Sequence, residues 1–144
     1  MRIFVVFWSG TGNTEAMAEA VGRGIRKGGG DGVLLPVSEA DPEVIASQTV
    51  FALGCPSMGA EELEEMEMEP FVASLEGKLT GKKILLFGSY GWGDGEWMRS
   101  WEARMKQAGA ELVTGTGIIA NEAPDEEAVL ACEQGGEMLA SAVK

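Results

Sequence analysis

The sequence predicts a single α/β domain, a doubly wound five-stranded parallel sheet with helices on both faces. Five short apolar runs alternate with amphipathic stretches along the chain. The runs are apolar throughout, which is typical of parallel strands covered on both faces, and their alternation with helices implies right-handed crossovers. With 144 residues the chain has the size of one domain, so we assign residues 1–144 to a single unit.

The apolar runs define the predicted strands, which cover residues 3–8, 33–37, 50–54, 84–88 and, as a broken run, 112–120. After the first run, Met17, Val21 and Ile25 follow helical spacing, and three glycines at 28–30 end this helix. After the fourth run, Trp97 and Trp101 lie on one face of a helix that ends near Gly109. Each of these strands is therefore followed by its own helix.

The other helices are shorter or lie at the end of the chain. We expect short helices over 43–46 and 70–76. Before the last helix, Pro124 suits the first helical turn, and the acidic residues at 125–127 suit its positive end. Sheets of this kind bind ligands beyond the carboxyl ends of their strands, so the loops after the first, third and fourth strands should carry the function.

The amino-acid composition excludes several classes of catalytic and metal-binding site. Histidine is absent, which removes Ser-His-Asp and Cys-His arrangements and the commonest zinc ligand. Cys55 and Cys132 form no CxxC pair, so we interpret both as reduced, buried thiols. We predict no metal site and no catalytic residue. Any chemistry must come from a bound cofactor or from carboxylates.

The net charge of the chain limits the classes of binding partner. The net charge of −12 disfavours nucleic acid and anionic membranes as partners and favours basic protein surfaces, although acidity could serve solubility alone. No stretch approaches the roughly 20 apolar residues that cross a bilayer, and MRIFVVFW lacks a small-residue cleavage site. We therefore expect a cytoplasmic protein.

The loop after the first strand offers a phosphate site. It contains backbone N–H groups, hydroxyls, an amide and the positive end of a helix in the residues Ser9, Gly10, Thr11, Gly12, Asn13 and Thr14. It lacks the lysine of a Walker A motif, and Glu15 replaces the third glycine of a GxGxxG fingerprint. A monophosphate is therefore favoured over ATP or a dinucleotide. The alternative is a glycine-rich turn with a hydroxyl cap.

TGNT after a first strand resembles the FMN phosphate loop of flavodoxins. The resemblance implies the flavodoxin-like strand order 2-1-3-4-5 and contacts to the FMN phosphate from Ser9, Thr11, Asn13 and Thr14. Flavodoxin is itself a standard example of ligand binding where the strand order reverses, so the placement of FMN comes from the resemblance.

The loops after the third and fourth strands suit a planar ligand. The first contains Pro56, Ser57, Met58, Gly59, Ala60 and Glu61, and the second contains Ser89, Tyr90, Gly91, Trp92, Gly93 and Asp94. A flat aromatic ligand needs a stacking group on each face, and Met58 and Trp92 could supply them. Trp92 lies between two glycines, a poor place for a core residue, whereas Met58 could equally fill the core.

GSYGWGDG and the MGxE turn resemble those of clostridial-type short flavodoxins along the whole chain. The resemblance implies Met58 on the inner face of the isoalloxazine, Trp92 on its outer face and Glu61 at the N3 edge. It also implies that the carbonyl at Gly59 turns to accept a hydrogen bond from the reduced ring's N5–H.

The chain departs from the flavodoxin pattern that it resembles at three positions in or near these loops. Ala60 replaces a frequent aspartate, Pro56 replaces a hydroxyl residue for which Ser57 substitutes in part, and Ala123 lengthens the segment after Asn121. We still include Asn121 among the cofactor contacts.

By this resemblance, the chain is a low-potential one-electron carrier with non-covalent FMN that cycles between semiquinone and hydroquinone, and it is not an enzyme. Expected partners are basic redox proteins, namely reductases, oxidoreductases and ferredoxin-dependent enzymes, and we expect a monomer. The alternatives are an FMN-dependent NAD(P)H reductase and a flavin-free adaptor module.

An acidic run follows the MGxE turn. Six glutamates between residues 61 and 69 form either a solvated face or a docking surface for basic partners.

Overall fold

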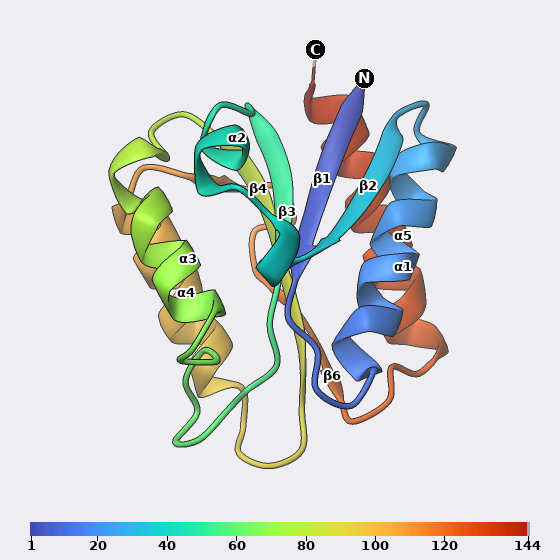
Figure 1. The fold of residues 1–144 in the computed structure, drawn as a ribbon. Coiled ribbons are helices and arrows are strands. Elements are labelled where there is room, and N and C mark those ends of the chain that lie inside the picture. The colour runs from blue at the N-terminus through green and yellow to red at the C-terminus, as the bar shows by residue number, and fades with distance from the viewer. Residues whose placement is uncertain (144) are drawn as a thin grey trace.

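A parallel sheet lies at the centre of the computed structural model, which describes residues 1–143 (Figure 1). Its strands run in the order β2-β1-β3-β4-β5, and β6 also pairs with β4. The strands are β1 (Arg2–Phe7), β2 (Asp31–Pro36), β3 (Val50–Gly54), β4 (Lys83–Tyr90), β5 (Glu111–Leu112) and β6 (Ile118–Asn121). The predicted doubly wound sheet and its strand order are confirmed.

The predicted fifth strand consists of two short pieces, β5 and β6, which pair with opposite ends of β4. A turn separates them: Gly115 has a φ of 80°, and the Thr114 hydroxyl donates to the Thr116 carbonyl over 2.6 Å. Gly117 then passes so close to Met98 that a side chain would collide with it. These contacts explain why the apolar pattern is broken here.

Helices cover both faces of the sheet (Figure 1). They are α1 (Asn13–Lys27), α2 (Pro42–Ala46), α3 (Met68–Leu75), α4 (Glu96–Gln107) and α5 (Glu126–Ala142). The helices α1 and α5 pack on one face, and α3 and α4 lie on the other. No helix in the described part of the chain is long and apolar enough to cross a bilayer.

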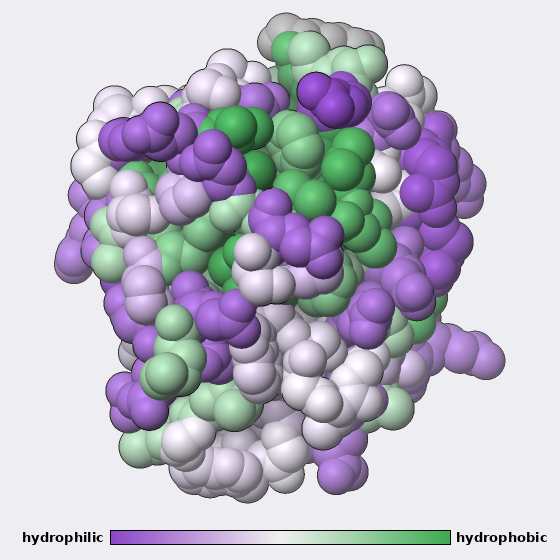
Figure 2. Space-filling view, viewed as in Figure 1, coloured by the Kyte–Doolittle hydropathy of each residue, from purple (hydrophilic) through white to green (hydrophobic). Residues whose placement is uncertain are grey.

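Each face of the sheet has its own buried core. On one side Val5 of β1 packs with Met17 and Val21 of α1 and with Leu139 of α5. On the opposite face, side chains of β3 and β4 pack with Phe71 of α3 and with Trp97 and Trp101 of α4, among others. Figure 2 shows a further hydrophobic patch over the edge strand β2, whose apolar side chains are only half-buried.

Two glycines allow α1 and α5 to approach closely. A Cβ on Gly24 of α1 would overlap the carbonyl oxygen of Glu133 in α5, and one on Gly136 of α5 would overlap the carbonyl oxygen of Val21. These obstacles are backbone atoms, which cannot rotate away as a side chain can. The helix pair is therefore fixed at a separation that only glycine permits.

Some predicted boundaries are wrong. Pro124 lies before α5 and not in its first turn, because the Asp125 carboxylate accepts a hydrogen bond of 2.8 Å from the Ala128 N–H and so caps the helix. Val37 belongs to a 3₁₀ turn after β2 and not to the strand. The helix predicted over 70–76 begins earlier, at Met68.

Candidate functional site

The candidate site is a cavity of about 270 Å³ at the carboxyl ends of β1, β3 and β4. It lies where the strand order reverses direction, between β1 and β3, and the loops after these strands diverge there. Its lining residues are Trp8, Gly10, Thr11, Asn13, Pro56, Ser57, Met58, Ser89, Tyr90, Gly91 and Glu122. The structure thus brings together residues from all three predicted loops.

The loop from Ser9 to Thr14 leads into the N-terminus of α1. The Ser9 hydroxyl accepts hydrogen bonds from the N–H groups of Gly12, at 3.1 Å, and Glu15, at 3.2 Å. Gly12 has a φ of 95°, which a residue with a Cβ adopts only at a cost. The N–H groups of the first helical turn have no intrahelical partner, so the loop offers donors and a positive dipole to an anion.

Thr14 connects this loop to β4. Its hydroxyl lies 2.9 Å from the Ser89 hydroxyl and accepts from the Ser89 N–H at 3.3 Å. Both residues are buried. Thr14 and Ser89 therefore fix two of the cavity's walls relative to one another, and their contact with a phosphate stays a prediction.

The loop after β3 forms a small closed tip. The backbones of Met58 and Glu62 exchange two hydrogen bonds of 2.8 Å, so that Gly59, Ala60 and Glu61 make the turn between them. Gly59 and Glu61 have φ values of 51° and 56°. A Glu61 carboxylate oxygen accepts from the Glu96 N–H over 3.0 Å, which attaches the tip to the start of α4.

Ser57 brings a polar side chain without a hydrogen-bond partner to the cavity. Its N–H donates to the Ser89 carbonyl over 2.9 Å, but its side-chain oxygen is buried with no hydrogen-bond partner. An unsatisfied buried hydroxyl is costly, and a ligand oxygen or nitrogen in the cavity would satisfy it.

The loop after β4 carries an exposed aromatic residue, Trp92, which does not line the cavity. Trp92 is 58% exposed, as expected for a residue that does not belong to the core. Neighbouring Gly93 has a φ of 84° and lies against the Glu61 carboxylate. Asp94 pairs with Arg99 of α4 over 2.9 Å. Stacking of Trp92 and Met58 on a ring stays a prediction.

Two lining residues were not predicted, and ten predicted residues do not line this cavity. The ten are Ser9, Gly12, Thr14, Gly59, Ala60, Glu61, Trp92, Gly93, Asp94 and Asn121. Trp8 was assigned only to the first strand, although an aromatic residue directly before Ser9 is a signal that could have identified it. Glu122 lines the cavity because its backbone has a φ of 58° and its N–H donates to the Tyr90 carbonyl over 2.7 Å. No local sequence pattern predicts this backbone conformation. The Asn121 amide donates to the same carbonyl at 3.4 Å, and Asn121 lines a different cavity.

The acidic run is not one continuous face. Glu64 is 6% exposed, and its carboxylate accepts from three backbone N–H groups. Glu69 forms an ion pair of 2.7 Å with Arg104, which also binds Glu76 and so joins α3 to α4. Glu62 and Glu65 remain on the exposed surface. The six glutamates therefore do not form one exposed face, and a docking role for the exposed ones stays a prediction.

The pKa of Glu64 predicts a pH effect on stability. Burial raises this pKa, but the three N–H donors outweigh burial and hold it below its ordinary value of 4.5. The ionised carboxylate thus stabilises the fold above pH 4.5, and this contribution is lost as the pH falls through the lower folded-state pKa. We expect Glu64→Gln to lower the free energy of unfolding by about 2 kcal/mol at pH 7.

Urea denaturation at pH 7 and pH 3 measures this effect. The difference between the wild type and Glu64→Gln should shrink at the lower pH. Glu65→Gln, which removes a neighbouring exposed charge, serves as the control and should change stability little at either pH. An undiminished difference at low pH would contradict the assigned role of the Glu64 carboxylate.

The two cysteines are free and buried, as predicted. Burial raises the pKa of both thiols to about 12, so neither is a reactive thiolate at neutral pH. Within residues 1–143, no group of three or more Cys, Asp or Glu side chains is arranged to hold a metal ion.

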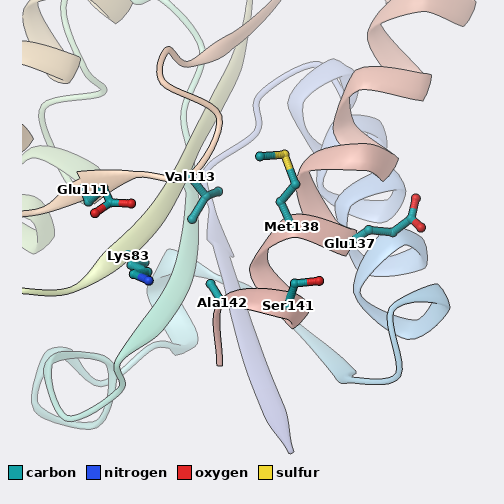
Figure 3. Close-up of a pocket in the computed structure, with 7 residues that line it drawn as sticks. All are labelled: Lys83, Glu111, Val113, Glu137, Met138, Ser141 and Ala142. Atoms are coloured by element: carbon teal, nitrogen blue, oxygen red, sulfur yellow. The ribbon is translucent and has the colours of Figure 1, made fainter. Parts of the chain in front are cut away.

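Another cavity, of about 370 Å³, lies at the opposite end of the sheet (Figure 3). In Figure 3 Lys83 and Glu111, at the amino ends of β4 and β5, face the last turns of α5 with Met138 and Ser141. No predicted site residue lines it. The site at the carboxyl ends of the strands is therefore the functional candidate.

The residues of that site fit a phosphate-bearing aromatic cofactor. The loop from Ser9 to Thr14 supplies uncharged donors at a helix N-terminus, and Ser57 holds an unpartnered hydroxyl nearby. Trp8, Met58 and Tyr90 add apolar surface to the same cavity. This combination of a neutral anion cradle with an apolar slot suits a flavin monophosphate.

Comparisons with known proteins agree with this assignment. The flavodoxin family model matches residues 5–135. The chain is 46% identical to a flavodoxin of Megasphaera elsdenii over 96% of the chain and 98% of the relative, and 48% identical to one of Clostridium beijerinckii over 85% and 88%. The solution structure of the two-electron reduced Megasphaera elsdenii flavodoxin superposes with a TM-score of 0.87, at 45% identity, over 98% of this chain and 99% of that one.

Proposed function

The chain belongs to the flavodoxin family of FMN-binding electron carriers, and we propose that its FMN lies in the cavity between the loops after β1, β3 and β4. The protein is a carrier and not an enzyme. The observation that best supports the location is the unpartnered, buried Ser57 hydroxyl in a cavity lined by the predicted phosphate loop. FMN, when bound, supplies the one-electron chemistry.

The loop after β1 holds the phosphate in this proposal. Ser9 keeps the loop closed on α1 through its two backbone hydrogen bonds, and Thr11 and Asn13 line the cavity. No lysine or arginine lies in the loop to neutralise the phosphate. The protein therefore binds a dianion through backbone dipoles. Further negative charge near the phosphate is disfavoured, which lowers the reduction potential of the bound flavin.

The other two loops enclose the ring. Met58 and Trp92 would cover the two faces of a bound ring, Glu61 would lie at its edge, and the tip at Gly59 would turn so that its carbonyl accepts a hydrogen bond from a ring N–H. Gly59 suits this movement because its φ of 51° costs little without a Cβ, and a Cβ there would meet no atom within 4 Å. The predicted roles of Gly91, Gly93 and Asp94 in the same loops belong to this proposal.

We also propose that partners with basic surfaces dock beside the site. Support comes from the net charge of −12 and from the exposed Glu62 and Glu65 next to the tip. Reductases and other oxidoreductases, with ferredoxin-dependent enzymes among them, fit this description. A monomer of one domain over residues 1–144, in a reducing cytoplasm that keeps Cys55 and Cys132 as thiols, completes the proposal.

Stepwise reduction of the purified protein, followed in the visible spectrum, tests the function. We expect a yellow protein that passes through a blue, neutral one-electron state before it is bleached, because the Gly59 carbonyl stabilises a proton on the ring. A colourless protein that does not retain added FMN would contradict the proposed site. Rapid oxidation of NADPH without a separate reductase would contradict the carrier role.

A further inference from the structure

Glu64 is a buried acidic residue in the segment between β3 and α3. One carboxylate oxygen accepts from the Met66 N–H at 2.7 Å, and the other accepts from the N–H groups of Glu67, at 2.7 Å, and Met68, at 2.9 Å. The side chain thus holds the start of α3.

The backbone of Glu64 makes two further attachments. Its N–H donates to the Cys55 Sγ over 3.4 Å, and its carbonyl accepts from the Glu69 N–H at 2.8 Å. Cys55 directly follows β3 and is fully buried. Glu64 therefore connects the end of β3 to the start of α3 across the base of the whole loop.

The tip of the loop after β3, residues 59–61, lies between two segments that hydrogen bonds hold in place, which we call the first leg (residues 55–58) and the second leg (residues 62–64). The first leg is attached to β4 by the hydrogen bond from the Ser57 N–H to the Ser89 carbonyl. The second leg runs from Glu62, which pairs with Met58, to Glu64. The residues between Met58 and Glu62 take no part in these attachments, and the tip's own bond is the one of 3.0 Å from the Glu96 N–H to the Glu61 carboxylate.

We propose that Glu64 is a positioning residue, which anchors the second leg and thereby confines the redox-linked turn to Gly59, Ala60 and Glu61. This inference rests on the proposed function, because the turn is meaningful only if FMN lies against the tip. Without the anchor, the tip samples more orientations. The Gly59 carbonyl then meets the ring less often, and the one-electron state loses stability.

Three variants separate this role from charge and from folding. Glu64→Gln removes the charge and places an amide against N–H donors, and Glu64→Asp keeps the charge but shortens the reach. Glu65→Gln removes an exposed neighbouring charge as the matched control. A loss of charge alone should act mainly on the second reduction step, in which negative charge accumulates.

Potentiometric titration of the FMN-loaded proteins gives the first readout. We expect the first one-electron potential to fall by about 59 mV, a tenfold loss, in both Glu64 variants. In Glu65→Gln the first potential should differ from that of the wild type by no more than a twofold change in the equilibrium constant of reduction, or about 18 mV. Equal first potentials in all four proteins would overturn the inference.

Amide hydrogen exchange of the FMN-free proteins gives a second readout that does not depend on the cofactor. The amides of residues 60–62 should exchange at least tenfold faster in both Glu64 variants, while those of Val21 and Ile25 in α1 stay unchanged. Faster exchange limited to residues 66–68 would mean that Glu64 only caps α3, and it would overturn the inference even if the wild type failed to bind FMN. Failure of the wild type to bind FMN would by itself reject only the proposed function.

Discussion

Replacement of Thr11 by aspartate should weaken FMN binding about a hundredfold or more. Thr11 lines the cavity in a loop whose donors are all uncharged, so the new carboxylate would lie beside the phosphate without a cation between them. Juxtaposed like charges in a binding site cost several kcal/mol, and each 1.4 kcal/mol is about tenfold in affinity. Titration of FMN into the FMN-free protein, followed by quenching of flavin fluorescence, measures the change.

Thr49→Asp is the matched control for this experiment. Thr49 is exposed and directly precedes β3, so it lies at the opposite end of the sheet. The variant has the same net charge as Thr11→Asp and should bind FMN about as tightly as the wild type. If both variants lost affinity equally, the effect would come from overall charge, and the phosphate would not lie at residues 9–14. Higher ionic strength should reduce the Thr11→Asp defect only in part, because the two charges are close.

Gly24→Ala should destabilise the fold by about 1–2 kcal/mol, although alanine is the better helix former. The added Cβ would overlap the Glu133 carbonyl oxygen, so α1 and α5 would have to move apart. Overpacking of this kind typically costs 1–3 kcal/mol, more than the roughly 1 kcal/mol that alanine gains over glycine in a helix. Urea denaturation of the FMN-free protein measures the difference without a contribution from cofactor binding.

Gly22→Ala tests the same substitution in the same helix. A Cβ on Gly22 would meet the Leu34 Cδ1 atom, which is the end of a flexible side chain on the edge strand β2. That side chain can rotate, so we expect Gly22→Ala to be close to neutral or slightly stabilising. Equal stability of the two variants would show that the contact between α1 and α5 yields as easily as a side chain does.

The elements that the sequence predicted well are those that depend on neighbouring residues. Apolar runs located all the strands, and the helical spacing of Met17, Val21 and Ile25 located α1, because periodicity is a local property of the chain. The glycines and hydroxyls of residues 9–14 likewise indicated the turn before α1, and its binding of a phosphate stays a prediction. Errors arose where a cap decided the boundary, as at Pro124, since Asp125 begins α5 through its own side chain.

The acidic run shows where sequence reasoning failed. Six glutamates with similar surroundings in the sequence have different roles in the structure. Glu64 is buried under three N–H donors, Glu69 pairs with Arg104 of another helix, and Glu61 binds the start of α4. Each role depends on a partner or a backbone direction that only the folded chain provides. Charge patterning alone could not separate the exposed carboxylates from the structural ones.

By itself, the sequence determined the doubly wound fold, the order of its elements and the loops that form the candidate cavity. Hydrophobic periodicity and turn-forming residues are properties of contiguous segments of the chain. The tertiary structure alone decided that Trp8 and Glu122 line the cavity, that Ser57 is left without a partner, and that the Glu64 carboxylate accepts from three N–H groups at the start of α3. These features depend on distances between segments far apart in the chain. Such distances are set by how the helices and the sheet pack, and no local pattern encodes them.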